Sequence, residues 1–140
     1  ITSIQITKSV SGEGDGTKKA SDTMGMKHRV DHGLYVFYGS INPQLASRTG
    51  FSDQDAEDIK HALVHLFDND SSSARPEGSM EVVKVVWWEH PNLNGKFSSA
   101  RVHRSLKVAV KDGVVEPKNL DDYAIHLDNL DGIKVEVIGG

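Results

Sequence analysis

The sequence predicts an α+β fold in which one main helix covers a face of a sheet. Segments rich in β-branched and aromatic residues recur along the chain, and one segment between them has helical periodicity. The order is strand, strand, helix, strand, strand, strand. The chain has 140 residues and a 37% apolar fraction, as is typical of one folded domain. We therefore expect residues 1–140 to form a single domain.

The first part of the chain predicts two strands joined by a long loop. Residues 1–8 are rich in isoleucine and threonine, which favour a strand. Residues 9–26 lose this pattern and contain Gly12, Gly14 and Gly16, so we expect a mobile inserted loop there. Residues 28–41 are densely apolar and aromatic, which indicates a central strand buried on both faces.

The main helix has the clearest local signal. Ser52 and Asp55 form the S/T-x-x-acid pattern of a capping box at the start of a helix. Apolar residues then recur every three or four positions as far as Phe67, so the helix is predicted over residues 53–68. A single helical turn is expected before it, over residues 44–48.

Further strands are predicted over residues 80–89, 102–111 and 133–138, whereas residues 117–132 give no clear pattern. In a strand, side chains alternate between two faces. The 102–111 strand would therefore put Arg104 on the face opposite its basic neighbours Arg101, His103 and Lys107. On this prediction the basic residues of the segment cannot all face one ligand.

The sequence favours neither catalysis nor metal binding. The absence of cysteine excludes disulfides and cysteine-ligated metals. His61 and His65 lie four residues apart, but the zinc-protease motif needs a glutamate where Ala62 stands. No phosphate-binding glycine loop or nucleophile elbow occurs. We expect a protein that is not an enzyme, with no cofactor and no metal. A hydrolase that uses His61, His65 or His103 is the least favoured alternative.

Charge is strongly segregated along the chain, although the net charge is only −4. Residues 51–70 and 112–140 each sum to −5, whereas residues 96–111 hold five basic and no acidic residues. Such segregation suits a polyanion-binding surface or head-to-tail contact between copies, and solvated faces are the alternative. No apolar run approaches the ~20 residues of a membrane span, and no secretory signal is visible.

A colinear series of motifs resembles one protein family. The motifs are Ile4-Gln5-Ile6-Thr7-Lys8, Met24-Gly25-Met26-Lys27-His28, His32-Gly33-Leu34-Tyr35, Thr49-Gly50-Phe51-Ser52, Asp70-Ser71-Ser72-Ser73-Ala74-Arg75 and Trp88-Glu89-His90. In this order they resemble the RNA-binding backbone subunit of type I CRISPR surveillance complexes (Cascade), the Cas-seven family, in its I-C-like branch. Met26 and Ser71 stand where family members usually carry a basic residue.

The resemblance implies an RRM-like (ferredoxin-like) sheet with one main helix and inserted loops. Family members are longer, and this chain corresponds to their C-terminal half, so the sheet is expected to be incomplete. The implied function is that of a non-catalytic, cytoplasmic subunit in antiviral defence. Its copies stack along a CRISPR RNA beside other Cascade subunits and present the guide for pairing with target DNA.

The resemblance also implies an RNA-binding set. The basic family positions are Lys8, Lys27 and Arg75, and the neighbouring cations Lys18, Lys19 and Arg29 are added to them. We expect these side chains to contact RNA phosphates, which would make binding salt-sensitive and independent of sequence. The alternative function is a structural interaction domain without nucleic-acid binding, which would associate through unpaired strand edges.

Overall fold

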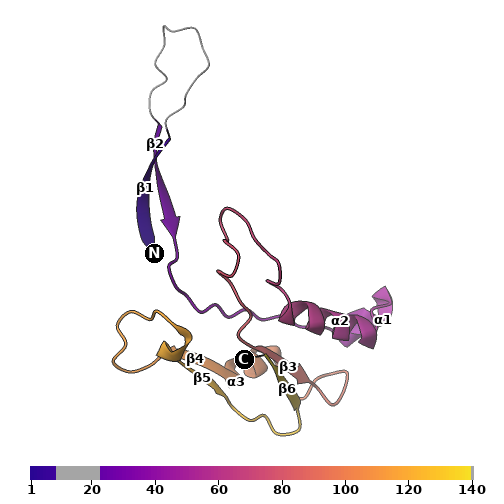
Figure 1. The fold of residues 1–140 in the computed structure, drawn as a ribbon. Helices are drawn as coiled ribbons and strands as arrows, with labels where there is room; N and C mark the ends of the chain where they lie inside the picture. The colour runs from indigo at the N-terminus through magenta and orange to yellow at the C-terminus, as the bar shows by residue number, and fades with distance from the viewer. Residues whose placement is uncertain (9–22, 140) are drawn as a thin grey trace, which may run out of the picture. The chain divides into compact units, whose positions relative to one another are not determined.

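The computed structural model describes residues 1–8 and 23–139, and it contains both helices and strands (Figure 1). The chain forms two units, which are described separately: residues 1–36 with 108–124, here the hairpin unit, and residues 37–107 with 125–140, here the helical unit. Within the described residues, the strands pair two by two into three small sheets. The predicted α+β class is confirmed, and these elements are compatible with an RRM-like fold.

The hairpin unit begins with two antiparallel strands, β1 (Thr2–Lys8) and β2 (Thr23–Arg29). Their register runs from Thr2 opposite Arg29 to Lys8 opposite Thr23. The first predicted strand is thus confirmed. The inserted loop was predicted over residues 9–26, but residues 23–26 belong to β2. Residues 9–22 lie outside the described part of the chain.

Residues 30–41 do not form the predicted central strand. They are neither helix nor strand, and the side chains of Tyr35 and Phe37 are each 70% exposed. A strand needs a neighbouring strand to bond with its backbone N–H and C=O groups. Among the described strands, none pairs with this segment. The composition of residues 30–41 thus predicted a strand, but no strand among the described residues pairs with them.

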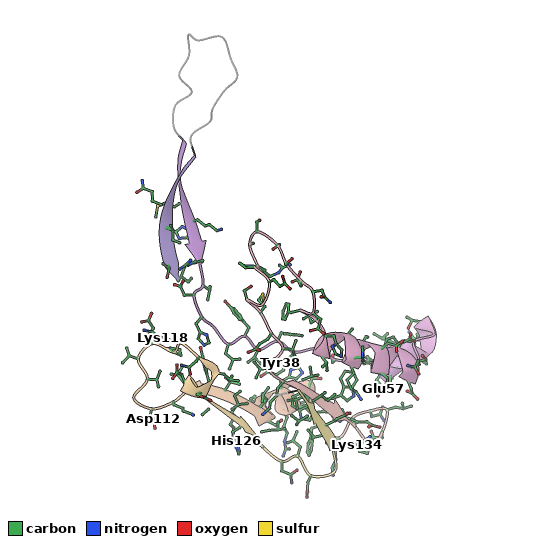
Figure 2. The ribbon with its side chains drawn as sticks, viewed as in Figure 1. Tyr38, Glu57, Asp112, Lys118, His126 and Lys134 are labelled. Carbon is green, nitrogen blue, oxygen red and sulfur yellow. The ribbon has the colours of Figure 1, made fainter. Side chains whose placement is uncertain are left out.

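Two later strands pair with each other, β4 (Leu106–Val110) and β5 (Tyr123–Leu127). The loop between them carries the short 3-10 helix η1 (Leu120–Asp122), in a stretch for which the sequence predicted no element. The backbone N–H of Lys118, labelled in Figure 2, donates to the Asp122 carboxylate at 2.7 Å. This bond is the main reason why the pKa of Asp122 lies below its ordinary value.

Two capped helices open the helical unit, α1 (Pro43–Thr49) and α2 (Asp53–Val64). The Asn42 side chain accepts hydrogen bonds from backbone N–H groups in the first turn of α1. At α2, Ser52 and Asp55 form the predicted capping box, in which the Ser52 N–H donates to the Asp55 carboxylate at 2.7 Å. Both helices are thus confirmed, although α2 ends earlier than expected. No helix in the described ranges is long and apolar enough to cross a membrane.

A two-stranded antiparallel sheet forms the centre of the helical unit. It pairs β3 (Val85–Glu89) with β6 (Lys134–Ile138), and Trp88 lies opposite Val135. This pair packs against the buried core, which consists of Val102, Leu130 and Ile133. The predicted strand over 133–138 is confirmed, and the one over 80–89 is confirmed in its second half.

The predicted strand over residues 102–111 is wrong in its first part. A helix, α3 (Ser99–Ser105), comes first and leads directly into β4. The Ser98 side chain caps this helix by accepting the Arg101 N–H. Val102 and Ser105 are buried, and they lie three residues apart, which is the spacing of one helix face. The sequence analysis identified the apolar residues, but it interpreted their spacing as the two-residue repeat of a strand and not as the repeat of a helix.

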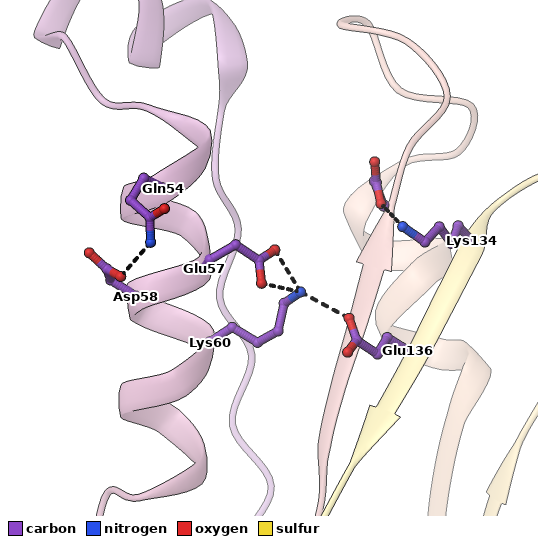
Figure 3. Close-up of polar contacts among 7 residues, drawn as sticks. Gln54, Glu57, Asp58, Lys60, Lys134 and Glu136 are labelled. Carbon is purple, nitrogen blue, oxygen red and sulfur yellow. Dashed lines mark hydrogen bonds and ion pairs between the residues drawn. The ribbon is translucent and has the colours of Figure 1, made fainter.

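A lysine fills the space between α2 and the other face of the β3–β6 sheet. Lys60 is only 8% exposed. Its Nζ donates to the carboxylates of Glu57 at 2.8 Å and Glu136 at 2.9 Å, and it lies 5.2 Å from the centre of the Trp87 ring (Figure 3). The hydrogen bonds to Glu57 and Glu136 raise the pKa of Lys60. The sheet is therefore covered on both faces, by the α3 core and by α2.

Acid should destabilise the helical unit, because three of its carboxylates have a lowered pKa. The donors responsible are Ser52 for Asp55, Lys134 for Glu89, and Lys107 for Asp128. A carboxylate with a folded pKa below its unfolded value stabilises the fold above pH ~4, and that stabilisation is lost as the pH falls through the folded pKa. We expect the urea midpoint, followed by tryptophan fluorescence, to fall as the pH drops below ~4, by a modest amount because these groups are solvent-exposed.

A pair of variants tests the origin of this acid effect. Asp128→Asn should make the urea midpoint less dependent on pH than in the parent chain, since one of the ionised groups is removed. Asp131→Asn is the matched control, because Asp131 is exposed and makes no side-chain hydrogen bond among the described residues. Equal pH dependence in the parent chain and in Asp128→Asn would contradict the assignment.

Candidate nucleic-acid interface

Three of the predicted RNA-binding positions fall on one face of the β1–β2 hairpin. Lys27 is opposite Ile4, Arg29 is opposite Thr2, and position 8 is opposite Thr23. Residues directly opposite each other, and residues two apart along a strand, share a face of the hairpin. Positions 8, 27 and 29 therefore share one face. The register makes a single basic face from residues that lie about twenty positions apart in sequence.

The two described cations of this face differ in their surroundings. Lys27 is exposed and has no ion-pair partner among the described residues. Arg29 donates from Nε to the Asp31 carboxylate at 2.6 Å, and the Thr2 hydroxyl donates to the same carboxylate. Arg29 is thus held in place by an acid that also offsets part of its charge. Both side chains of this ion pair are about half exposed, so solvent screens the attraction.

The opposite face of the hairpin is polar and apolar rather than basic. It carries Ser3 and His28, whose Oγ and Nδ1 lie 2.8 Å apart, and the exposed Met26. Of the other predicted site residues, Lys18 and Lys19 lie outside the described part of the chain.

Arg75 belongs to the helical unit, so its surroundings are described within that unit alone. It lies in the loop after α2, where its guanidinium donates to Asp70 from Nε at 2.9 Å and from Nη2 at 3.3 Å. This hydrogen bonding raises the pKa of Arg75. The two guanidinium N–H groups of Arg75 that could hold a phosphate already donate to a carboxylate of the same chain.

The structure brings together two basic residues that the sequence interpretation had separated. Arg101 and Arg104 both lie on α3 and are three residues apart, so they occupy neighbouring positions on one helix face. A strand would have put them on opposite faces. The signal that could have identified the helix is Ser98, a good N-cap residue followed by residues that tolerate a helix.

Two histidine side chains, one in the last turn of α2 and one at its C-cap, come close together without forming a metal centre among the described residues. The rings of His61 and His65 have their centres 4.4 Å apart, and His65 Nδ1 lies 2.6 Å from the Asp68 carboxylate. Across the described residues, no three histidine, cysteine or acidic side chains are grouped so that they could hold a metal ion. The hydrolase alternative gains no support from this arrangement.

Comparison with known families identifies the class of protein. The family model of CRISPR-associated protein Cas7 matches residues 1–128. The match covers most of the chain, so the chain belongs to this family, and its class is that of CRISPR-associated backbone subunits. No curated protein matches the chain significantly. The family predicted from the colinear motifs is therefore confirmed. Its I-C-like branch and the correspondence to the C-terminal half stay predictions.

Proposed function

We propose that this chain is a non-catalytic RNA-coating subunit of a type I CRISPR interference complex, of the I-C-like branch. Its copies associate along a CRISPR RNA in the cytoplasm, together with other Cascade subunits, and leave the guide free to pair with target DNA. The chain corresponds to the C-terminal part of the longer subunit. Membership of the Cas7 family carries the general proposal.

The β1–β2 hairpin supplies the observation that supports RNA binding. Its register gives positions 8, 27 and 29 a common face. Lys18 and Lys19 belong to the sequence between the two strands. A row of cations on one strand pair follows a phosphate backbone without reading bases. Contacts of this kind release counterions, so the affinity falls as salt is added. For single strands, the slope of log K against log salt is about −0.7 per phosphate contact.

The test is a titration of labelled single-stranded RNA with the chain at several salt concentrations. The variant Lys27→Ala/Arg29→Ala should bind all RNA sequences more weakly, and the slope of log K against log salt should shrink by ~1.4 for two lost phosphate contacts. A matched control is Lys84→Ala/Lys111→Ala, which removes the same charge from two other exposed positions.

Three results would contradict this proposal. A loss confined to particular RNA sequences would indicate base recognition rather than phosphate contact. An equal loss in the control would mean that only net charge matters. If the parent chain binds no RNA but forms concentration-dependent oligomers, the alternative of a structural interaction domain is favoured. The exposed, unpaired segment at residues 30–41 is the feature that such an interaction would use.

A further inference from the structure

A pocket of about 270 Å³ lies between α3 and the residues that follow β5, within the helical unit. It is lined by Arg101, Arg104, Ser105, Asp128, Asn129 and Leu130. The backbone N–H of Asp128 donates to the C=O of Ser105 at 2.8 Å, so the two walls are joined directly. The volume is below the ~300–1,000 Å³ of sites for drug-sized ligands. The pocket therefore suits one small group rather than a whole nucleotide.

The two arginines of the pocket are placed to receive an anion. Neither Arg101 nor Arg104 forms an ion pair with an acid of the described residues, unlike Arg29 and Arg75. The guanidinium carbon of Arg101 lies 4.2 Å from the centre of the Phe97 ring. A guanidinium stacked on a ring keeps its in-plane N–H donors available to a further acceptor.

The one acid in the pocket is already neutralised by its own partners. Lys107 Nζ lies 2.6 Å from the Asp128 carboxylate, and Nε2 of His126, which is labelled on β5 in Figure 2, lies 3.1 Å from it. The Lys107 hydrogen bond also lowers the pKa of Asp128, so this carboxylate stays ionised and paired. Among the described residues, the charges of Arg101 and Arg104 are thus left without a counter-charge.

We propose that the Arg101–Arg104 pocket binds a phosphate group. Guanidinium N–H pairs match phosphate oxygens in bidentate geometry, and the exposed Asn129 amide stands at the same opening as a neutral donor. Two arginines repel a metal cation, and the mostly polar lining does not suit an apolar ligand. If the phosphate belongs to an RNA backbone, the inference rests on the proposed function. A free phosphate would occupy the same pocket without it.

Inorganic phosphate is the first probe, because it tests the pocket without RNA. We expect saturable NMR shifts of the Arg101 and Arg104 Nε–H signals and of the Asn129 amide in the parent chain. The shifts of the Asn129 amide should be lost in Arg101→Gln/Arg104→Gln and kept in the control Arg48→Gln/Lys84→Gln, which changes net charge equally. No saturable shift would overturn the proposal. Equal shifts with acetate at matched ionic strength would also overturn it, in favour of a carboxylate partner from a protein.

Labelled single-stranded RNA is the second probe and identifies the source of the phosphate. If the pocket holds one RNA phosphate, Arg101→Gln/Arg104→Gln should reduce the slope of log K against log salt by ~0.7. When the salt is lowered from 1 M to 0.1 M, the affinity of this variant should then rise about fivefold less than that of the parent chain. Arg104→Lys should keep the slope but bind more weakly, since the charge remains and the fork is lost. Unchanged tryptophan fluorescence shows that the variants are folded.

The two probes separate the failure of this inference from that of the proposed function. Phosphate shifts with an unchanged RNA slope support the pocket and assign it to a free phosphate compound. Phosphate shifts in a chain that binds no RNA support the pocket and contradict the proposed function. RNA binding that is lost only in the hairpin variants, with no phosphate shift at the pocket, overturns the inference and leaves the proposed function in place.

Discussion

Replacing Ile133 by alanine is expected to lower the free energy of unfolding of the helical unit by about 2–4 kcal/mol, because the truncation leaves a cavity. Ile133 is one of three buried apolar residues in the core, and Trp88 packs against them. A core this small has few neighbours that could close the gap. The expected loss is a large share of the ~5–15 kcal/mol that holds a typical domain together.

Urea unfolding followed by tryptophan fluorescence measures this loss directly. The chain has two tryptophans, and both lie in β3, so the signal reports on the helical unit. Ile133→Val should cost only about 0.5–1.5 kcal/mol, since one methyl group is removed. Leu93→Ala is the matched control, because Leu93 is 70% exposed. A midpoint in Ile133→Ala equal to that of Leu93→Ala would refute the assigned core.

Removal of residues 9–22 should abolish assembly of copies on RNA while the β1–β2 pairing persists. Lys8 and Thr23 are opposite each other in the register, so an Asn-Gly dipeptide between them closes a two-residue hairpin turn. The deletion removes Lys18 and Lys19, two of the predicted RNA-binding cations. Particle mass on a single-stranded RNA long enough for several copies is the measurement. The parent should give multiples of the chain, and the deletion should not.

A second variant separates charge from loop length in that experiment. Lys18→Ala/Lys19→Ala keeps every residue of the segment but removes both cations. If assembly depends on phosphate contact, this variant should assemble only at low salt. If it depends on contact with a neighbouring copy, the variant should assemble normally while the deletion does not. Normal assembly of the deletion would exclude any role for residues 9–22.

The fold was predictable wherever a local signal decides the structure. The start of α2 followed from Ser52 and Asp55, because a capping box acts within four residues. The segment at 30–41 was not predictable in this way, because strand formation depends on a partner elsewhere. The helix over 99–105 was missed for another reason. Its buried residues Val102 and Ser105 also fit a short apolar run, which periodicity alone cannot assign.

The basic positions of the candidate interface were recognisable in the sequence, but their arrangement on the hairpin was not. Lys8, Lys27 and Arg29 were recognisable as basic positions, and only the register shows that they share a face. The ion pair of Arg29 with Asp31 depends on the path of the backbone just after β2, which no sequence pattern predicts. Lys60 was equally hidden, since lysine is among the least buried residue types. Its burial requires two glutamates, one of them from a distant strand.

The exposed segment at residues 33–41 has a consequence for the colloidal behaviour of the chain. These nine residues contain no charge and no proline, and they include Tyr35, Phe37 and Tyr38 with nearly half or more of their surface in solvent. Such a sequence has the composition of a steric zipper. Only Asp31 before it and Pro43 after it stand as gatekeepers against stacking of copies. We therefore expect substitutions in this segment to change the highest concentration at which the free chain stays dispersed more than equal changes of charge elsewhere.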